Sequence, residues 1–110
     1  MRVRWLRRAL GELEQAGLYV ARDRPSALRW VEDVISRMGH VAAFPESGRI
    51  VPELGNPRVR EIIYPHVRVI YRIDSAEVVV MIVWNTRRDV RKLVRRLEPF
   101  RLPGVMDASA

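Results

Sequence analysis

A chain of 110 residues with 20 Lys and Arg against 13 Asp and Glu carries a formal charge of +7, which predicts attraction to a polyanion or an acidic partner. Its length suits one domain, and a hydrophobic content of 48% suits a packed core. The sequence has no cysteine, which excludes a disulfide scaffold, a thiolate metal site and a cysteine nucleophile.

The N-terminus carries charges throughout and lacks the apolar core of a signal peptide. No run of residues approaches the roughly 18 apolar residues of a membrane span. We therefore expect a cytoplasmic protein that does not enter a membrane. The two histidines, His40 and His66, have no second ligand at metal spacing, so neither a metal nor a cofactor is expected.

The first half of the chain predicts a strand followed by two helices. Residues 2–5 alternate charged and apolar side chains, which is typical of a short strand. From Leu6 to about Arg22 apolar residues recur every three or four positions, as in an amphipathic helix whose wet side includes Arg8, Glu12 and Gln15. A second helix should begin near Pro25 and stop before residue 45, which makes an antiparallel helical hairpin.

The second half predicts a sheet. Residues 44–58 hold three prolines and two glycines and are expected to form a surface loop. The runs 59–64, 67–73 and 77–84 are rich in β-branched residues and separated by short turns, so they should form an antiparallel meander. The third run is apolar on both faces, which indicates a central strand.

The middle run separates two kinds of side chain by its period of two. Val67, Val69, Tyr71 and Ile73 should point toward the helices, whereas Arg68 and Arg72 should point to the opposite face. If helices cover only one side of the sheet, that opposite face is open to water. Its guanidinium groups would then be accessible to an anion.

The C-terminal part predicts a short basic helix. Six basic residues repeat at helical spacing opposite an apolar stripe, namely Arg87, Arg88, Arg91, Lys92, Arg95 and Arg96. Residues 98–110 lack periodicity and are expected to be a flexible tail after a single domain at 1–97. The predicted fold class is α+β, with a helical hairpin on one face of a small, mostly antiparallel sheet in the order β-α-α-β-β-β.

This order of elements, with an ordered series of short motifs, resembles the RelE/ParE superfamily of toxins from bacterial type II toxin-antitoxin systems. The resemblance spans about residues 2–93. No single motif is specific, but their order and spacing are. The residues that carry it are Pro45, Gly48, Arg49, Pro52, Glu53, Leu54, Arg60, Glu61, Tyr71 and Arg72.

The resemblance implies a toxin that forms a hetero-oligomer with a cognate acidic antitoxin, ParD-like or RelB-like. The ParE-like branch is known for poisoning DNA gyrase, and the RelE-like branch cuts mRNA on the ribosome. The stretches "GRIVPEL" and "RVIYRI" resemble the ParE-like branch more closely. No Tyr or His follows Trp84, so an obvious group for moving a proton in RNA cleavage is missing.

We therefore expect a gyrase inhibitor rather than an enzyme, with a ribosome-dependent mRNA endoribonuclease as the alternative. A basic nucleic-acid-binding module without toxicity remains a third hypothesis. The candidates for contact with the target are Arg68, Arg72, Arg87 and Arg88, and those for contact with the antitoxin are Arg91 and Arg95. If the protein is a ribonuclease, its catalytic candidates are Arg60, Arg68 and Arg87.

Overall fold

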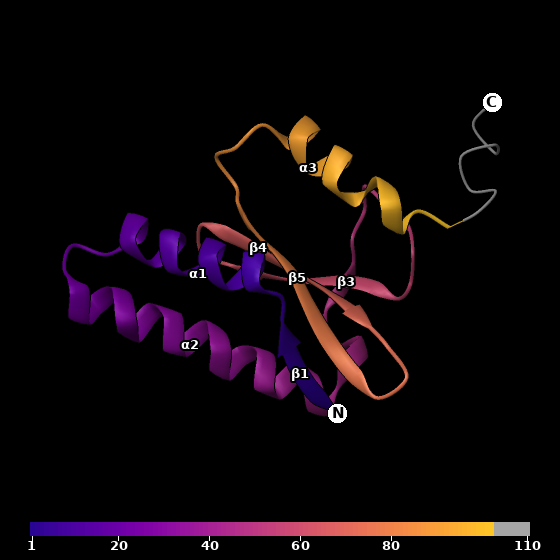
Figure 1. Ribbon diagram of the computed structural model, residues 1–110, viewed down its shortest axis with the longest axis horizontal. Helices are drawn as coiled ribbons and strands as arrows, with labels where there is room; N and C mark the ends of the chain where they lie inside the picture. The colour runs from indigo at the N-terminus through magenta and orange to yellow at the C-terminus, as the bar shows by residue number, and fades with distance from the viewer. Residues whose placement is uncertain (103–110) are drawn as a thin grey trace.

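A computed structural model describes residues 1–102 as two layers of helices around one sheet (Figure 1). The elements are β1 (Arg2–Trp5), α1 (Arg7–Val20), α2 (Arg24–Ala43), a 3-10 turn η1 (Pro45–Ser47), β2 (Arg49–Ile50), β3 (Val59–Tyr64), β4 (Val67–Ile73), β5 (Glu77–Asn85), α3 (Val90–Leu97) and a 3-10 turn η2 (Glu98–Phe100). The predicted α+β class is confirmed.

The sheet has five strands in the order β1-β5-β4-β3-β2. β1 runs parallel to β5, and the other neighbours are antiparallel. The central position predicted for β5 is confirmed, because β1 and β4 flank it. The expected loop over 44–58 was wrong in one place, since Arg49 and Ile50 pair with β3 as the edge strand β2.

The helical hairpin forms for local reasons that the sequence already contains. Asp23 caps α2 by accepting a hydrogen bond from the Ser26 N–H at 2.8 Å, and Pro25 occupies the first turn, where its missing N–H costs nothing. Gly17 lets the two helices approach closely. A Cβ atom built there would lie 2.9 Å from Cγ2 of Val31, so a larger residue would push the hairpin apart.

A first core lies between this hairpin and the sheet. Ala9 and Leu13 of α1 and Val34 and Met38 of α2 pack against sheet residues that include Tyr71. The predicted inward face of β4 is confirmed, since Val67, Val69, Tyr71 and Ile73 all belong to this core or pack against it.

A second core covers the other face of the sheet. Leu93 and Leu97 of α3, together with Val51 and Leu54, pack against residues of β3, β4 and β5. A β-bulge contributes to it: Tyr71 is opposite Val80 but Ile70 is opposite Ile82, so the extra residue Met81 and its neighbour Ile82 both join the second core. The expectation of an open face was therefore wrong, because α3 and the segment after β2 bury it.

The expected tail begins as ordered structure. Glu98–Phe100 form η2, Phe100 packs against the second core, and the Asn56 Nδ2 donates to the Phe100 carbonyl at 2.9 Å. The rest of the expected tail, residues 103–110, lies outside the described residues. Between residues 1 and 102 no helix is both long and apolar enough to cross a membrane.

Candidate functional site

Arg68, the first candidate for target contact, lies largely buried in a cluster of charges. Its Nη1 and Nη2 donate to the two carboxylate oxygens of Glu53 at 2.9 and 2.6 Å, and its Nε donates to Glu61 at 2.6 Å. Arg49 also reaches Glu61, at 2.7 Å. The Arg68 side chain is 11% exposed and that of Glu61 is 0% exposed. We call Arg49, Glu53, Glu61 and Arg68 the ion cluster.

The hydrogen bonds of the ion cluster stabilise the charged forms of Glu53 and Arg68. The hydrogen bonds from Arg68 keep the pKa of the Glu53 carboxyl below its ordinary value, against a smaller opposing effect of burial. The same bonds raise the pKa of Arg68 above its ordinary value. The guanidinium is therefore charged, but both of its donor edges are occupied. To contact an external phosphate with either edge, Arg68 must break its hydrogen bonds to Glu53 or Glu61.

Arg72 is occupied as well, although it is more exposed than Arg68. Its Nε and Nη2 donate to the two oxygens of Asp74 at 2.9 and 3.1 Å, and its guanidinium lies 5.9 Å from the centre of the Phe100 ring. The pairing with Asp74 raises the pKa of Arg72. The two open-face arginines expected from the sequence thus serve the fold.

The three ribonuclease candidates do not form one site. Arg60 lies on the helical-hairpin face of β3, opposite Tyr71, and donates to the carbonyls of Pro57 and Gly48 at 2.9 and 3.0 Å. Arg68 lies on the other face of the sheet, opposite Ile63. Arg87 follows the end of β5. A sheet therefore separates the first two, and no single phosphate can contact both.

Arg87 and Arg88 hold their charges against aromatic rings. Arg87 donates from Nη1 to the Tyr19 hydroxyl at 2.6 Å with its guanidinium 5.7 Å from that ring centre, and Arg88 lies 4.2 Å from the centre of the Trp84 ring. In the described part of the chain neither pairs with a carboxylate. A ring stabilises a cation without neutralising it, so both charges remain available.

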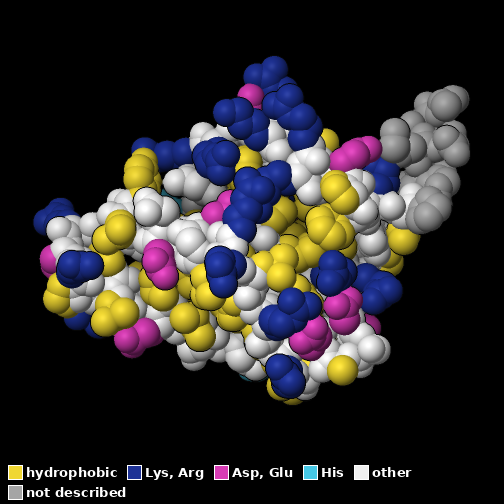
Figure 2. All heavy atoms as spheres, in the orientation of Figure 1, with side chains coloured by type: hydrophobic (Ala, Val, Ile, Leu, Met, Phe, Trp, Pro, Cys, Tyr) yellow, Lys and Arg dark blue, Asp and Glu magenta, His cyan; other side chains and the backbone are white. Residues whose placement is uncertain are grey.

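Helix α3 extends this positive charge. Asp89 caps the helix by accepting from the Arg91 N–H at 2.9 Å, and its carboxylate also pairs with the Arg91 side chain. Lys92 and Arg95 are exposed. Figure 2 shows dark blue side chains gathered over α3. We call Arg87, Arg88, Lys92 and Arg95 the C-terminal basic surface.

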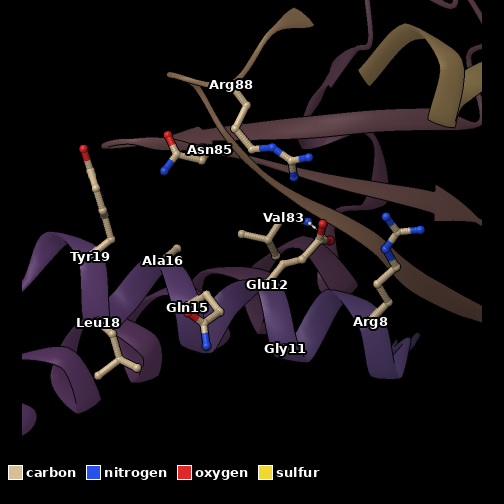
Figure 3. Close-up of a pocket in the computed structure, with 10 residues that line it drawn as sticks. All are labelled: Arg8, Gly11, Glu12, Gln15, Ala16, Leu18, Tyr19, Val83, Asn85 and Arg88. Atoms are coloured by element: carbon tan, nitrogen blue, oxygen red, sulfur yellow. Dashed lines mark hydrogen bonds between the residues drawn. The ribbon is translucent and has the colours of Figure 1, made fainter. Parts of the chain in front are cut away.

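A groove lies between α1 and the end of β5, beside this surface (Figure 3). Its volume is about 820 Å³. Its lining residues are Arg8, Gly11, Glu12, Gln15, Ala16, Leu18, Tyr19, Val83, Asn85 and Arg88. Glu12 pairs with Arg96 of α3 and also accepts the Val83 N–H at 3.2 Å. From the sequence, Glu12 was expected on the solvated side of its helix. Its helical neighbours Arg8, Gln15 and Ala16 also line the groove, and this shared helix face was the only sequence signal for its role.

A family model matches most of the chain. The model is that of the ParE toxin of the type II toxin-antitoxin system parDE, and it matches residues 3–90. The chain belongs to the ParE toxin family. The resemblance to the ParE-like branch is thereby confirmed, and this ParE-family chain is the toxin component of such a system.

A solved structure shares the fold of this ParE-family chain. A chain of the "Chromosomal ParDE TA system from P. aeruginosa" is 20% identical, with a TM-score of 0.62, over 77% of this chain and 95% of that chain. At 20% identity this similarity supports a shared fold and nothing more. Among curated proteins the comparison found no match. The family match ends at residue 90, so most of α3 lies beyond it.

Proposed function

We propose that this ParE-family toxin inhibits DNA gyrase and is neutralised by a cognate acidic antitoxin. The observation that carries the proposal is the C-terminal basic surface, whose cations have no carboxylate partner among residues 1–102. Arg68 and Arg72, by contrast, are bound to Glu53, Glu61 and Asp74. We therefore assign target contact to Arg87, Arg88 and α3 rather than to Arg68 and Arg72 of the sheet.

The positive charge of the toxin also supports an acidic antitoxin as its partner. A toxin with a net charge of +7 attracts an acidic chain over long range, and the system named for the similar structure contains both ParD and ParE. Arg95 of the basic surface is exposed and has no carboxylate partner among residues 1–102, so it can pair with such a chain. Arg91 can do so only by giving up Asp89, which costs little because the Arg91 side chain is 85% exposed.

One contact favours the alternative of an mRNA endoribonuclease. Tyr19 is exposed and its hydroxyl lies 2.6 Å from Arg87, which brings a proton-bearing group to one of the catalytic candidates. Tyr71 of β4 is unsuitable for this role, since burial raises the pKa of Tyr71 and its hydroxyl is bonded to Pro45 and Gly48. A Tyr19→Phe variant tests this alternative directly.

The first prediction concerns the target. The purified toxin is expected to block supercoiling by gyrase and to leave translated mRNA intact. Supercoiling and cleavage-complex assays, run beside primer extension on mRNA in a translation extract, measure both activities on one preparation. Codon-spaced cuts that disappear in Tyr19→Phe, with supercoiling unaffected, would establish the ribonuclease alternative instead.

The second prediction concerns the C-terminal basic surface. Replacing Arg87, Arg88 and Arg95 together with Gln should raise the toxin concentration needed for half-inhibition of gyrase by about tenfold or more, since three charge-assisted contacts are lost. The matched control replaces three exposed arginines of the hairpin, Arg22, Arg24 and Arg37, with Gln. Both variants lose the same net charge. Equal loss of inhibition in the two would mean that only overall charge matters.

A further inference from the structure

The exposed side of α3 carries cations and little apolar surface. Lys92 and Arg95 are exposed, whereas Leu93 and Leu97 of the same helix are buried in the second core. Val90, which is 48% exposed, is the one exposed apolar residue of α3. The centre of a protein interface typically consists of apolar and aromatic anchors and contains few lysines. This side of α3 therefore offers little anchorage to a protein partner.

The carboxylates beside α3 do not offset its positive charge. Three acidic residues flank or contact the helix, and each is paired with an arginine. The pairs are Asp89–Arg91, Glu98–Arg101 and Glu12–Arg96. The C-terminal basic surface therefore adds four positive charges that no carboxylate among residues 1–102 neutralises. A local excess of one sign of charge on one surface is typical of proteins that bind nucleic acid.

The two aromatic rings at this surface already carry a guanidinium. Trp84 is buried beneath Arg88, and the Arg87 guanidinium lies over the exposed ring of Tyr19. Proteins that bind single strands stack the bases on aromatic side chains. Cations without a free ring suit the phosphates of a duplex, whose bases are already stacked on one another.

The size of the surface suits a few phosphates of one DNA strand. α3 has eight residues and is therefore about 12 Å long. A strand of B-DNA places one phosphate about every 3.4 Å along the axis, so about three or four lie beside the helix. Arg87 and Arg88 extend the surface beyond the N-terminus of α3. The helix lies on the side of the sheet away from the hairpin (Figure 1), so the hairpin is not part of this surface.

We propose that the C-terminal basic surface binds the phosphate backbone of the duplex DNA that gyrase holds, rather than gyrase itself. Its guanidinium and ammonium groups contact phosphates and therefore do not read the base sequence. The inference rests on the proposed function, in which gyrase is the target. It adds the partner of the surface and the reason for its charge: the DNA holds the toxin at the enzyme.

The first test measures how the parent toxin alone binds a short labelled DNA duplex, by fluorescence anisotropy at several salt concentrations. Four neutralised phosphates predict a slope of about −3.6 for the logarithm of affinity against the logarithm of salt concentration. Affinity should therefore fall about a hundredfold between about 50 and 200 mM salt. A second duplex of unrelated sequence should bind equally well. Absence of binding at the lower salt, or a slope near zero, would overturn the inference.

The triple variant of the basic surface and its hairpin control separate local from overall charge. Gln at Arg87, Arg88 and Arg95 removes three of the four cations, so the slope should fall to about −1 and the duplex should bind about tenfold more weakly or worse. The hairpin control has the same net charge and should keep the slope of the parent. Equal slopes in the two variants would mean that net charge alone attracts DNA, which would contradict a binding surface at α3.

A further titration distinguishes DNA from protein as the partner. The parent and the triple variant are each titrated into gyrase that holds no DNA, and the two should bind equally, because the replaced arginines contact only DNA. Weaker binding of the variant to DNA-free gyrase would assign the surface to the protein and overturn the inference. Tighter binding of single-stranded RNA than of duplex DNA by the parent, at equal salt, would also overturn it.

The inference and the proposed function fail separately. Duplex binding is measured without gyrase, so inhibition of supercoiling by a toxin that does not bind the duplex overturns the DNA contact alone. Duplex binding that depends on the basic surface, with supercoiling unaffected, supports the DNA contact and removes gyrase as the target.

Discussion

Replacing Arg68 with glutamine is expected to destabilise the toxin by about 3 kcal/mol or more, since removing one partner of a buried ion pair leaves a charge without compensation. Glu61, with 0% of its side chain exposed, would keep only Arg49, and Glu53 would lose its bidentate partner. Equilibrium unfolding in urea measures the loss as a lower midpoint with unchanged slope.

The matched control for this variant is Arg72→Gln. Arg72 lies on the same face of β4 but is 32% exposed, and its partner Asp74 is 28% exposed. Breaking a partly exposed surface pair of this kind typically costs about 0.2–1 kcal/mol. Similar midpoints for the two variants would mean that the ion cluster contributes no more than a surface pair.

The ion cluster also sets a pH dependence whose sign follows from Glu53. The pKa of Glu53 is lowered in the folded state by its hydrogen bonds to Arg68, from an ordinary value of 4.5. A lowered carboxyl pKa stabilises the fold above that ordinary value, and the stabilisation is lost as pH falls through the folded pKa. The parent should therefore lose stability below about pH 4.5 more steeply than Arg68→Gln. Parallel pH profiles would contradict this assignment.

Replacing Gly48 with alanine is expected to destabilise the toxin by about 3 kcal/mol, because the new methyl group has no room. A Cβ at this position would overlap the Tyr71 hydroxyl oxygen and lie 2.7 Å from the Glu61 carbonyl oxygen. Neither neighbour can move easily, since Tyr71 is fully buried and Glu61 is held in the β3 ladder. Thermal unfolding of the variant and parent measures the effect.

A glycine of α2 supplies the control for this variant. No atom lies within 4 Å of a Cβ built at Gly39, which is exposed within the helix. Gly39→Ala should therefore stabilise the toxin by about 0.5–1 kcal/mol through helix propensity. A destabilised Gly39→Ala would show that the difference between the two sites is not one of space.

The reason for the expected loss at Gly48 can be separated by a double-mutant cycle with Tyr71→Phe. The Tyr71 hydroxyl accepts the Gly48 N–H at 3.0 Å and donates to the Pro45 carbonyl at 2.7 Å, which holds the turn after α2 against the sheet. Without the hydroxyl, the alanine methyl meets only the Glu61 carbonyl and the ring carbon. The two substitutions should therefore couple by about 1 kcal/mol or more. Strict additivity would place the clash elsewhere.

The sequence alone determined the order of the elements other than β2, the hairpin and the inward face of β4. These features follow from local patterns: a period of three to four residues for the helices, a period of two for Val67, Val69, Tyr71 and Ile73, and proline at a helix start. The run from Val78 to Val83 likewise indicated a central strand, because a strand that is apolar on both faces must be covered on both.

The apolar run in β5 already contradicted the expectation of an open sheet face, although the alternation of β4 favoured that expectation. A central strand apolar on both faces requires cover on both, and α3 with its buried Leu93 and Leu97 supplies the second cover. The bulge at Met81 shifts the alternation of β5 by one residue. Val78 and Val80 face the hairpin before the bulge, whereas Val83 does so after it.

Only the tertiary structure decided which charges are free. Arg68 meets Glu53 across 15 residues of sequence and Glu12 meets Arg96 across 84. A periodic pattern assigns a side chain to a face but does not identify the residue that packs over it. Spacing therefore predicted two exposed arginines on β4, whereas folding brought carboxylates to both. Among residues 1–102, the residues of the C-terminal basic surface have no carboxylate partner. The physical reason is that charge pairing depends on distance in space, and burial of an arginine is favourable only where carboxylates from other elements arrive with it.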